Sequence, residues 1–247
     1  MKELHPEKGL RIFDIKWEVR TAGPSPNDNK RIEVFLLGCE KAKNGNPCKG
    51  CFNSVTWDKS IAEFARDPIE VADMINEGCD PLNKYISIGG GEPTDQLDYL
   101  IPFVKRLKEH GFHILMYTWK SLKEIINHPY ISYELTQSNP LIKNTAVYYV
   151  LESTYFSSKF REILKYLDIV IDGEFIQEEK LWDINSPNTA QNFIGSGNQI
   201  LWDIKNNKGY ALKDINNVSL LLQYDEIYDM QYIVLYDLKE DAEVLSY

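Results

Sequence analysis

The chain has 247 residues, of which 43% are hydrophobic, so it is long enough to bury a core and has the composition of a globular protein. Its net charge at pH 7 is −10 and no basic stretch runs along it, which argues against a nucleic-acid partner. No apolar run approaches the roughly 20 residues that cross a bilayer, and the first residues lack the apolar core of a signal peptide. We therefore expect a cytoplasmic protein with no membrane partner.

The first half of the chain predicts strands that alternate with helices. Apolar, β-forming residues at 32–37 indicate a strand, and a loop rich in glycine and asparagine follows it. A helix is expected over 68–78, where a proline suits the first turn and a glycine suits the end. A short buried strand is expected at 84–88, and apolar residues recur at helical spacing over 97–107, ending near Gly111.

The same alternation continues in the second half. Strands are expected at 112–117, 145–151 and 168–172, with helices at 120–127 and 156–166. Strands that alternate with helices form parallel βαβ units, so the pattern predicts an α/β fold with a largely parallel sheet.

Three segments interrupt this pattern. Loop-forming residues dominate 128–144 and 183–198, and after Gly209 only short apolar runs with acidic connections remain. We expect one domain over 1–210, with 211–247 as a C-terminal extension of the same domain.

Three of the four cysteines lie within thirteen residues, with the spacing Cys39-x8-Cys48-x2-Cys51. Such a group can hold an iron–sulfur cluster, or a structural zinc ion with Cys79 or a histidine as the fourth ligand, and the cysteines alone leave both open. A cubane held by three thiolates would leave one iron free for a small molecule. Cys79 stands alone near a helix end, which is typical of a small core residue.

A glycine-rich segment, GGGEP at 89–93, follows the strand expected at 84–88. Glycines let a backbone approach a ligand closely, and Glu92 adds a carboxylate that can pair with an ammonium group. The simpler interpretation is a strand-to-helix turn with Glu92 facing solvent. Because ligands bind at the carboxyl ends of parallel strands, we expect this segment and the cysteine loop to build one site.

Several stretches together resemble the radical SAM superfamily, and in particular the activating proteins of glycyl radical enzymes such as anaerobic ribonucleotide reductase. They are Ala22-Gly23-Pro24, PCKGCFNSVTWD from residue 47, ILMYTWKSLKEI from 114, LDIVIDGEFIQEEK from 167 and GSGNQILWD from 195. The resemblance implies a partial (β/α) barrel or an open, mostly parallel sheet of the radical SAM type. The chain departs from the family in its eight residues between the first two cysteines, in an insertion at about 127–164 and in its tail.

The resemblance also implies roles for individual residues. Cys39, Cys48 and Cys51 would each hold one iron of a [4Fe–4S] cluster, and S-adenosylmethionine (SAM) would chelate the fourth iron. The residues that would contact or orient SAM are Gly50 and Phe52 against the adenine, Asn53, Gly90, Gly91 and Glu92 at the methionine amino group, Tyr117 and Asn198.

The implied activity is the reductive cleavage of SAM to a 5′-deoxyadenosyl radical, which installs a glycyl radical on a partner enzyme. An external electron donor of the flavodoxin or ferredoxin type would reduce the cluster. Two alternatives are a radical SAM enzyme that acts on a small molecule or peptide, and a structural zinc-binding module.

Overall fold

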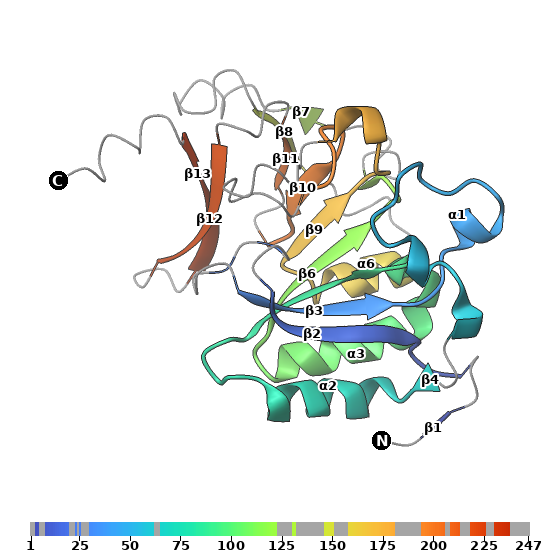
Figure 1. Ribbon diagram of the computed structural model, residues 1–247. Helices are drawn as coiled ribbons and strands as arrows, with labels where there is room; N and C mark the ends of the chain where they lie inside the picture. The colour runs from blue at the N-terminus through green and yellow to red at the C-terminus, as the bar shows by residue number, and fades with distance from the viewer. Residues whose placement is uncertain are drawn as a thin grey trace.

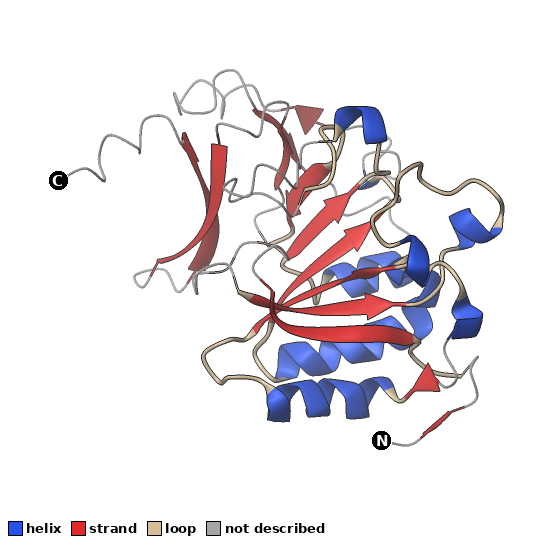
Figure 2. Ribbon diagram, viewed as in Figure 1, coloured by secondary structure: helices blue, strands red, loops and turns tan. Residues whose placement is uncertain are grey.

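A computed structural model describes most of the chain, and most of its strands form one large open sheet with helices packed against one face (Figures 1 and 2). The described residues are 3–4, 8–19, 23, 25, 30–61, 65–122, 130–131, 146–150, 158–180, 194–205, 208–212, 218–225 and 230–237.

The centre of the sheet is a parallel run of four strands. In spatial order these are β3 (Arg31–Leu36), β5 (Tyr85–Gly90), β6 (His113–Thr118) and β9 (Ile169–Asp172). β2 (Ile12–Val19) pairs antiparallel with β3 and forms one edge. The carboxyl ends of the four parallel strands therefore meet at one edge of the sheet, as the sequence predicted.

The other half of the sheet is antiparallel. Beyond β9 lie β10 (Ile200–Asp203), β11 (Lys208–Leu212), β8 (Ala146–Val150) and β7 (Tyr130–Ile131), in that order. The strand expected at 145–151 thus exists as β8, but it does not join the parallel run. β9 already pairs with β6 on one side and β10 on the other, so β8 pairs with β11 and β7 instead. The α/β class is confirmed, and the sheet is mixed.

Three helices supply the layer that covers the sheet: α2 (Pro68–Gly78), α3 (Leu97–Glu109) and α6 (Ser158–Leu164). Helix α2 begins where the sequence indicates, because the Asp67 side chain accepts hydrogen bonds from the backbone N–H groups of Ile69 and Glu70. The helix expected over 120–127 lies outside the described residues after Leu122.

The core lies between these helices and the parallel strands. Alternate residues of β3, namely Ile32, Val34 and Leu36, are buried against the helical layer, as are Ile86 and Ile88 of β5. The intervening residues of the same strands face the opposite side of the sheet, where the candidate site lies.

The remaining elements are short. They are β1 (Glu3–Leu4), which pairs with β4 (Ala65–Arg66), α1 (Glu40–Lys43), and the 3₁₀ turns η1 (Ser54–Thr56), η2 (Lys59–Ile61), η3 (Pro93–Gln96) and η5 (Gln177–Glu179).

The apolar runs of the tail form a separate two-stranded antiparallel sheet, β12 (Val218–Asp225) with β13 (Met230–Asp237). β11, in contrast, belongs to the main sheet. Most of the insertion expected at 127–164 and most of the loop expected at 183–198 lie outside the described residues. Among the described helices, none is long and apolar enough to span a membrane.

Candidate cofactor site

A cavity of about 340 Å³ opens where the parallel strands end. Residues that the sequence singled out line it together: Cys39, Cys48, Cys51, Phe52, Asn53, Gly90, Gly91, Glu92 and Tyr117. The two motifs, 38 residues or more apart in the chain, thus contribute to one site. Of the predicted site residues, Gly50 and Asn198 do not line the cavity.

The cysteine loop begins directly after β3 and is held by backbone hydrogen bonds. Gly38 donates its N–H to the carbonyl of Thr56, and Cys39 donates to the carbonyl of Trp57, which folds the end of the loop back onto its start. Between the second and third cysteines, Gly50 adopts a φ of +74°, and a Cβ there would lie 2.1 Å from the Gln177 side chain. Gly50 is therefore a turn residue that lets the loop close.

Burial disfavours the ionised form of two of these thiols when no cation is bound. Desolvation raises the pKa of Cys39, which is 7% exposed, and raises the pKa of Cys48 to about 11. Thiols bind metals as thiolates, so metal binding at this loop would release protons and offset the desolvation.

The cavity that the cysteines line has room for a group larger than a single ion. Within the described part of the chain, no three histidine, cysteine or acidic side chains converge closely enough to hold one metal ion. The three cysteines instead surround a shared cavity, as ligands of a larger group would. Cys79, the fourth ligand that a zinc site could use, lies at the end of α2, where its Sγ donates to the carbonyl of Asn76.

The glycine-rich segment packs against the cysteine loop. Gly91 donates its N–H to the carbonyl of Leu36 at 2.8 Å, and Glu92 donates to the carbonyl of Gly38 at 2.7 Å. A Cβ on Gly91 would lie 2.2 Å from the Gly38 oxygen, and one on Gly90, which has a φ of +97°, would lie 2.5 Å from the backbone of Leu36. These two glycines let the backbones of β3 and β5 approach closely, which brings Glu92 beside the cysteines.

The Glu92 carboxylate is buried, with 1% of the residue exposed, so the interpretation of Glu92 as a solvent-facing turn residue is wrong. One oxygen accepts from the Thr94 N–H at 3.0 Å, the Thr94 hydroxyl at 2.5 Å and the Thr118 hydroxyl at 2.8 Å, and the other accepts from the Trp119 N–H at 3.0 Å. Burial raises its pKa, and these hydrogen bonds and Lys120 act in the opposite direction. Glu92 therefore joins the end of β5 to the end of β6, and its contact with a SAM ammonium group stays a prediction.

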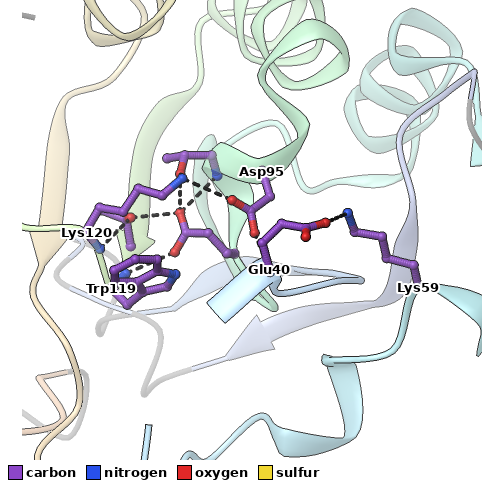
Figure 3. Close-up of polar contacts among 8 residues, drawn as sticks. Glu40, Lys59, Asp95, Trp119 and Lys120 are labelled. Carbon is purple, nitrogen blue, oxygen red and sulfur yellow. Dashed lines mark hydrogen bonds and ion pairs between the residues drawn. The ribbon is translucent and has the colours of Figure 1, made fainter. Parts of the chain in front are cut away.

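A chain of charges continues from this carboxylate toward the cysteine loop (Figure 3). Lys120 donates its ammonium to the Thr94 hydroxyl at 2.6 Å and to the Asp95 carboxylate at 3.0 Å. Asp95 in turn accepts the N–H of Glu40 at 2.7 Å, and Glu40 forms an ion pair with Lys59. The residue directly after Cys39 is thus tied to the segments that follow β5 and β6.

Of the two neighbouring polar residues in the loop at 194–199, Gln199 lines the cavity and Asn198 does not. Asn198 donates to the carbonyl of Glu174 and accepts from the Ser196 hydroxyl, so it holds the loop together. Its neighbour Gln199 lines the cavity, accepting from the N–H groups of Gly195 and Ser196 and donating to the carbonyl of Gly173.

Thr118, which ends the same predicted strand as Tyr117, also lines the cavity, together with residues that the sequence did not single out, among them Glu33, Phe35, Trp57, Trp119 and Phe175. Glu33 and Phe35 carry a signal, since they occupy alternate positions of a strand whose other face is apolar. Phe175 contacts Phe52, with ring centroids 4.7 Å apart, and Phe52 remains half exposed at the cavity mouth.

A cavity lined by thiols at the carboxyl ends of parallel strands defines the molecule as a cofactor-binding α/β protein. A protein-family model described as a 4Fe-4S single cluster domain matches residues 28–202. The chain belongs to this family of single-cluster iron–sulfur proteins, and the match supports the predicted cluster.

Individual proteins with similar sequences are activating proteins of other enzymes. The chain is 27% identical to the anaerobic ribonucleoside-triphosphate reductase-activating protein of Haemophilus influenzae over 72% of this chain and 90% of that protein. It is 25% identical to the protein of the same name from Pasteurella multocida over 71% of this chain and 88% of the relative. A shorter match, 31% identical over 97 residues, is to the pyruvate formate-lyase-activating enzyme of Listeria monocytogenes.

These relatives confirm the resemblance to activating proteins of the radical SAM class, and with it the prediction that the chain is an enzyme.

Proposed function

We propose that this protein is a glycyl radical enzyme activase, which cleaves SAM and abstracts a hydrogen atom from a backbone glycine of a partner such as anaerobic ribonucleotide reductase. The observation that carries the proposal is the shared cavity of Cys39, Cys48, Cys51 and the Gly-Gly-Glu segment. The extent of the match to the reductase-activating relatives supports the choice of partner.

In this proposal the three cysteines hold a [4Fe–4S] cluster through their thiolates and leave one iron to SAM. When bound and reduced, the cluster supplies the electron that breaks a carbon–sulfur bond of SAM. The chain's own residues bind and orient the reactants. Gly90 and Gly91 present backbone beside the cysteines, and the mainly apolar lining of the cavity restricts water near the radical.

The proposal extends to the type of barrel and to the source of the electrons. The parallel run β3-β5-β6-β9, with its site at the carboxyl ends, is compatible with part of a (β/α) barrel of the radical SAM type. An external donor of the flavodoxin or ferredoxin type would reduce the cluster, in a cytoplasmic setting.

One observation favours a second candidate, a radical SAM enzyme that acts on a small molecule or peptide. The family model ends at residue 202, within β10, so β11, β12 and β13 lie beyond it. Additional chain of this kind could serve a substrate that the reductase-activating relatives do not use.

Electron paramagnetic resonance under anaerobic conditions separates the two candidates. The sample contains the reconstituted protein, SAM, a reductant and an anaerobic ribonucleotide reductase. A doublet from a backbone glycyl radical on the reductase is the result expected for an activase. No such doublet, together with label transferred from a small molecule or peptide into 5′-deoxyadenosine, would favour the second candidate.

A further inference from the structure

The cavity extends along β3, away from the cysteines, as far as Glu33. Glu33 and Phe35 both line it, because they lie on the face of β3 opposite the buried Ile32 and Val34. The cysteine loop starts at the carboxyl end of β3. Two strand residues span about 7 Å, so Glu33 lies about 7 Å farther from that end than Phe35 does. Tyr117 of β6 also lines the cavity.

The Glu33 carboxylate differs from that of Glu92 in its hydrogen bonding within the described part of the protein. Among the residues that the structure describes, no hydrogen bond or ion pair to Glu33 is found and only the charge of Lys16 lowers its pKa, whereas Glu92 accepts four hydrogen bonds. Lys16, its cross-strand neighbour on β2, lies with its ammonium 5.0 Å from the centre of the Phe35 ring. A partly buried carboxylate in a ligand cavity is poorly solvated, so it gains from any donor that enters.

The electrostatics agree with an unsatisfied acceptor. Burial raises the pKa of Glu33 to about 7, and Lys16 acts in the opposite direction without cancelling the effect of burial. Hydrogen bonds donated by a ligand would favour the ionised form and return this pKa toward its ordinary value.

We propose that Glu33 is a substrate-recognition residue, whose carboxylate accepts hydrogen bonds from backbone N–H groups of the partner segment that carries the reacting glycine. The inference rests on the proposed activase function. A glycine offers only its backbone for recognition, and a carboxylate acts only as an acceptor, so the N–H groups are the partners it can use. Such charge-assisted hydrogen bonds are stronger than those between neutral groups.

The test compares Glu33→Gln and Glu33→Ala with the wild-type protein, using anaerobic ribonucleotide reductase as the substrate. Glycyl radical formation gives KM and kcat for the reductase, while iron per chain and SAM affinity are measured on the same preparations. Removal of the carboxylate in Glu33→Ala should raise KM for the reductase about tenfold and leave kcat, iron content and SAM affinity unchanged. Glu33→Gln keeps an acceptor oxygen and the side-chain shape, so its KM should rise less.

Glu77→Gln is the matched control, because Glu77 is exposed on α2 and does not line the cavity. Its KM should equal that of the wild type. An unchanged KM in Glu33→Ala, with active wild-type protein, would overturn the inference and leave the activase function standing. A fall in SAM affinity would also overturn it, since the carboxylate would then serve the SAM site. If wild-type protein forms no glycyl radical on the reductase, the proposed function and the inference fail together.

Discussion

At the scale of single residues, the Glu92 carboxylate holds parts of the chain together beside the cysteines. Its oxygens accept from two backbone N–H groups and two hydroxyls, and the donors come from the segment after β5, from the last residue of β6 and from the residue that follows it. The resemblance implied a contact with the amino group of SAM. The structure adds that the same carboxylate determines how these two segments meet beside the cysteines.

We therefore predict that Glu92→Gln lowers the free energy of unfolding by about 1–3 kcal/mol, because an amide N–H₂ must face at least one of the four donors. Chemical denaturation of the protein, monitored by circular dichroism, measures the change. Glu77→Gln, on the exposed side of α2, should unfold like the wild type. Equal stability of Glu92→Gln and the wild type would show that the buried hydrogen bonds contribute little.

At the scale of elements, the site depends on how the segments that follow β3, β5 and β6 are held together. Asp95 of η3 accepts the N–H of Glu40, the first residue of α1, and binds the ammonium of Lys120 (Figure 3). Because Glu40 directly follows Cys39, this carboxylate restrains the first cysteine. Residues that orient metal ligands in this way typically change metal affinity 10- to 100-fold when they are replaced.

We predict that Asp95→Ala loses its reconstituted cluster to an iron chelator about tenfold faster than the wild type, since the start of α1 loses a hydrogen bond and Lys120 loses its counter-ion. The decay of the visible absorbance of the cluster under anaerobic conditions measures this rate. Asp98→Ala serves as the control, because Asp98 lies in α3 and its exposed carboxylate pairs only with Lys159 among the described ion pairs. Equal rates for the two variants would exclude a positioning role for Asp95.

The sequence predicted those elements whose signals are local. Helix α2 begins at its Asp67-Pro68 cap and β5 ends at its glycines, because these residues determine the backbone around them. The antiparallel placement of β8 could not be predicted, since its partners β7 and β11 come from distant parts of the chain. The burial of Glu92 was missed for the same reason, as two of its donors belong to Thr118 and Trp119.

Only part of the candidate site could likewise be predicted from the sequence. The cysteines and the Gly-Gly-Glu segment could be brought together from the rule that parallel strands end at one edge. Choosing Gln199 over Asn198 required the packing of the loop at 194–199. The alternation along β3 places Glu33 on the face of the sheet away from the helices, but finding it inside the cavity required the depth of the cavity.

At the scale of the whole molecule, the parallel half of the sheet carries the site, and the antiparallel half continues the sheet beyond β9. The parallel strands lie within residues 28–202, which the family model matches, and they present the three cysteines to one cavity. β11, β12 and β13 lie beyond that match. The central claim for the molecule is that Cys39, Cys48 and Cys51 alone hold one [4Fe–4S] cluster with an open iron.

Iron analysis of anaerobically reconstituted wild-type protein and of four single cysteine-to-alanine variants tests this claim most directly. The account predicts about four irons per chain in the wild type and in Cys79→Ala, because the Cys79 thiol lies at the end of α2. Cys39→Ala, Cys48→Ala and Cys51→Ala should each lose the cluster and the ability to cleave SAM. Stoichiometric zinc in a colourless folded protein, or cluster loss in Cys79→Ala equal to that in the other three variants, would contradict the account.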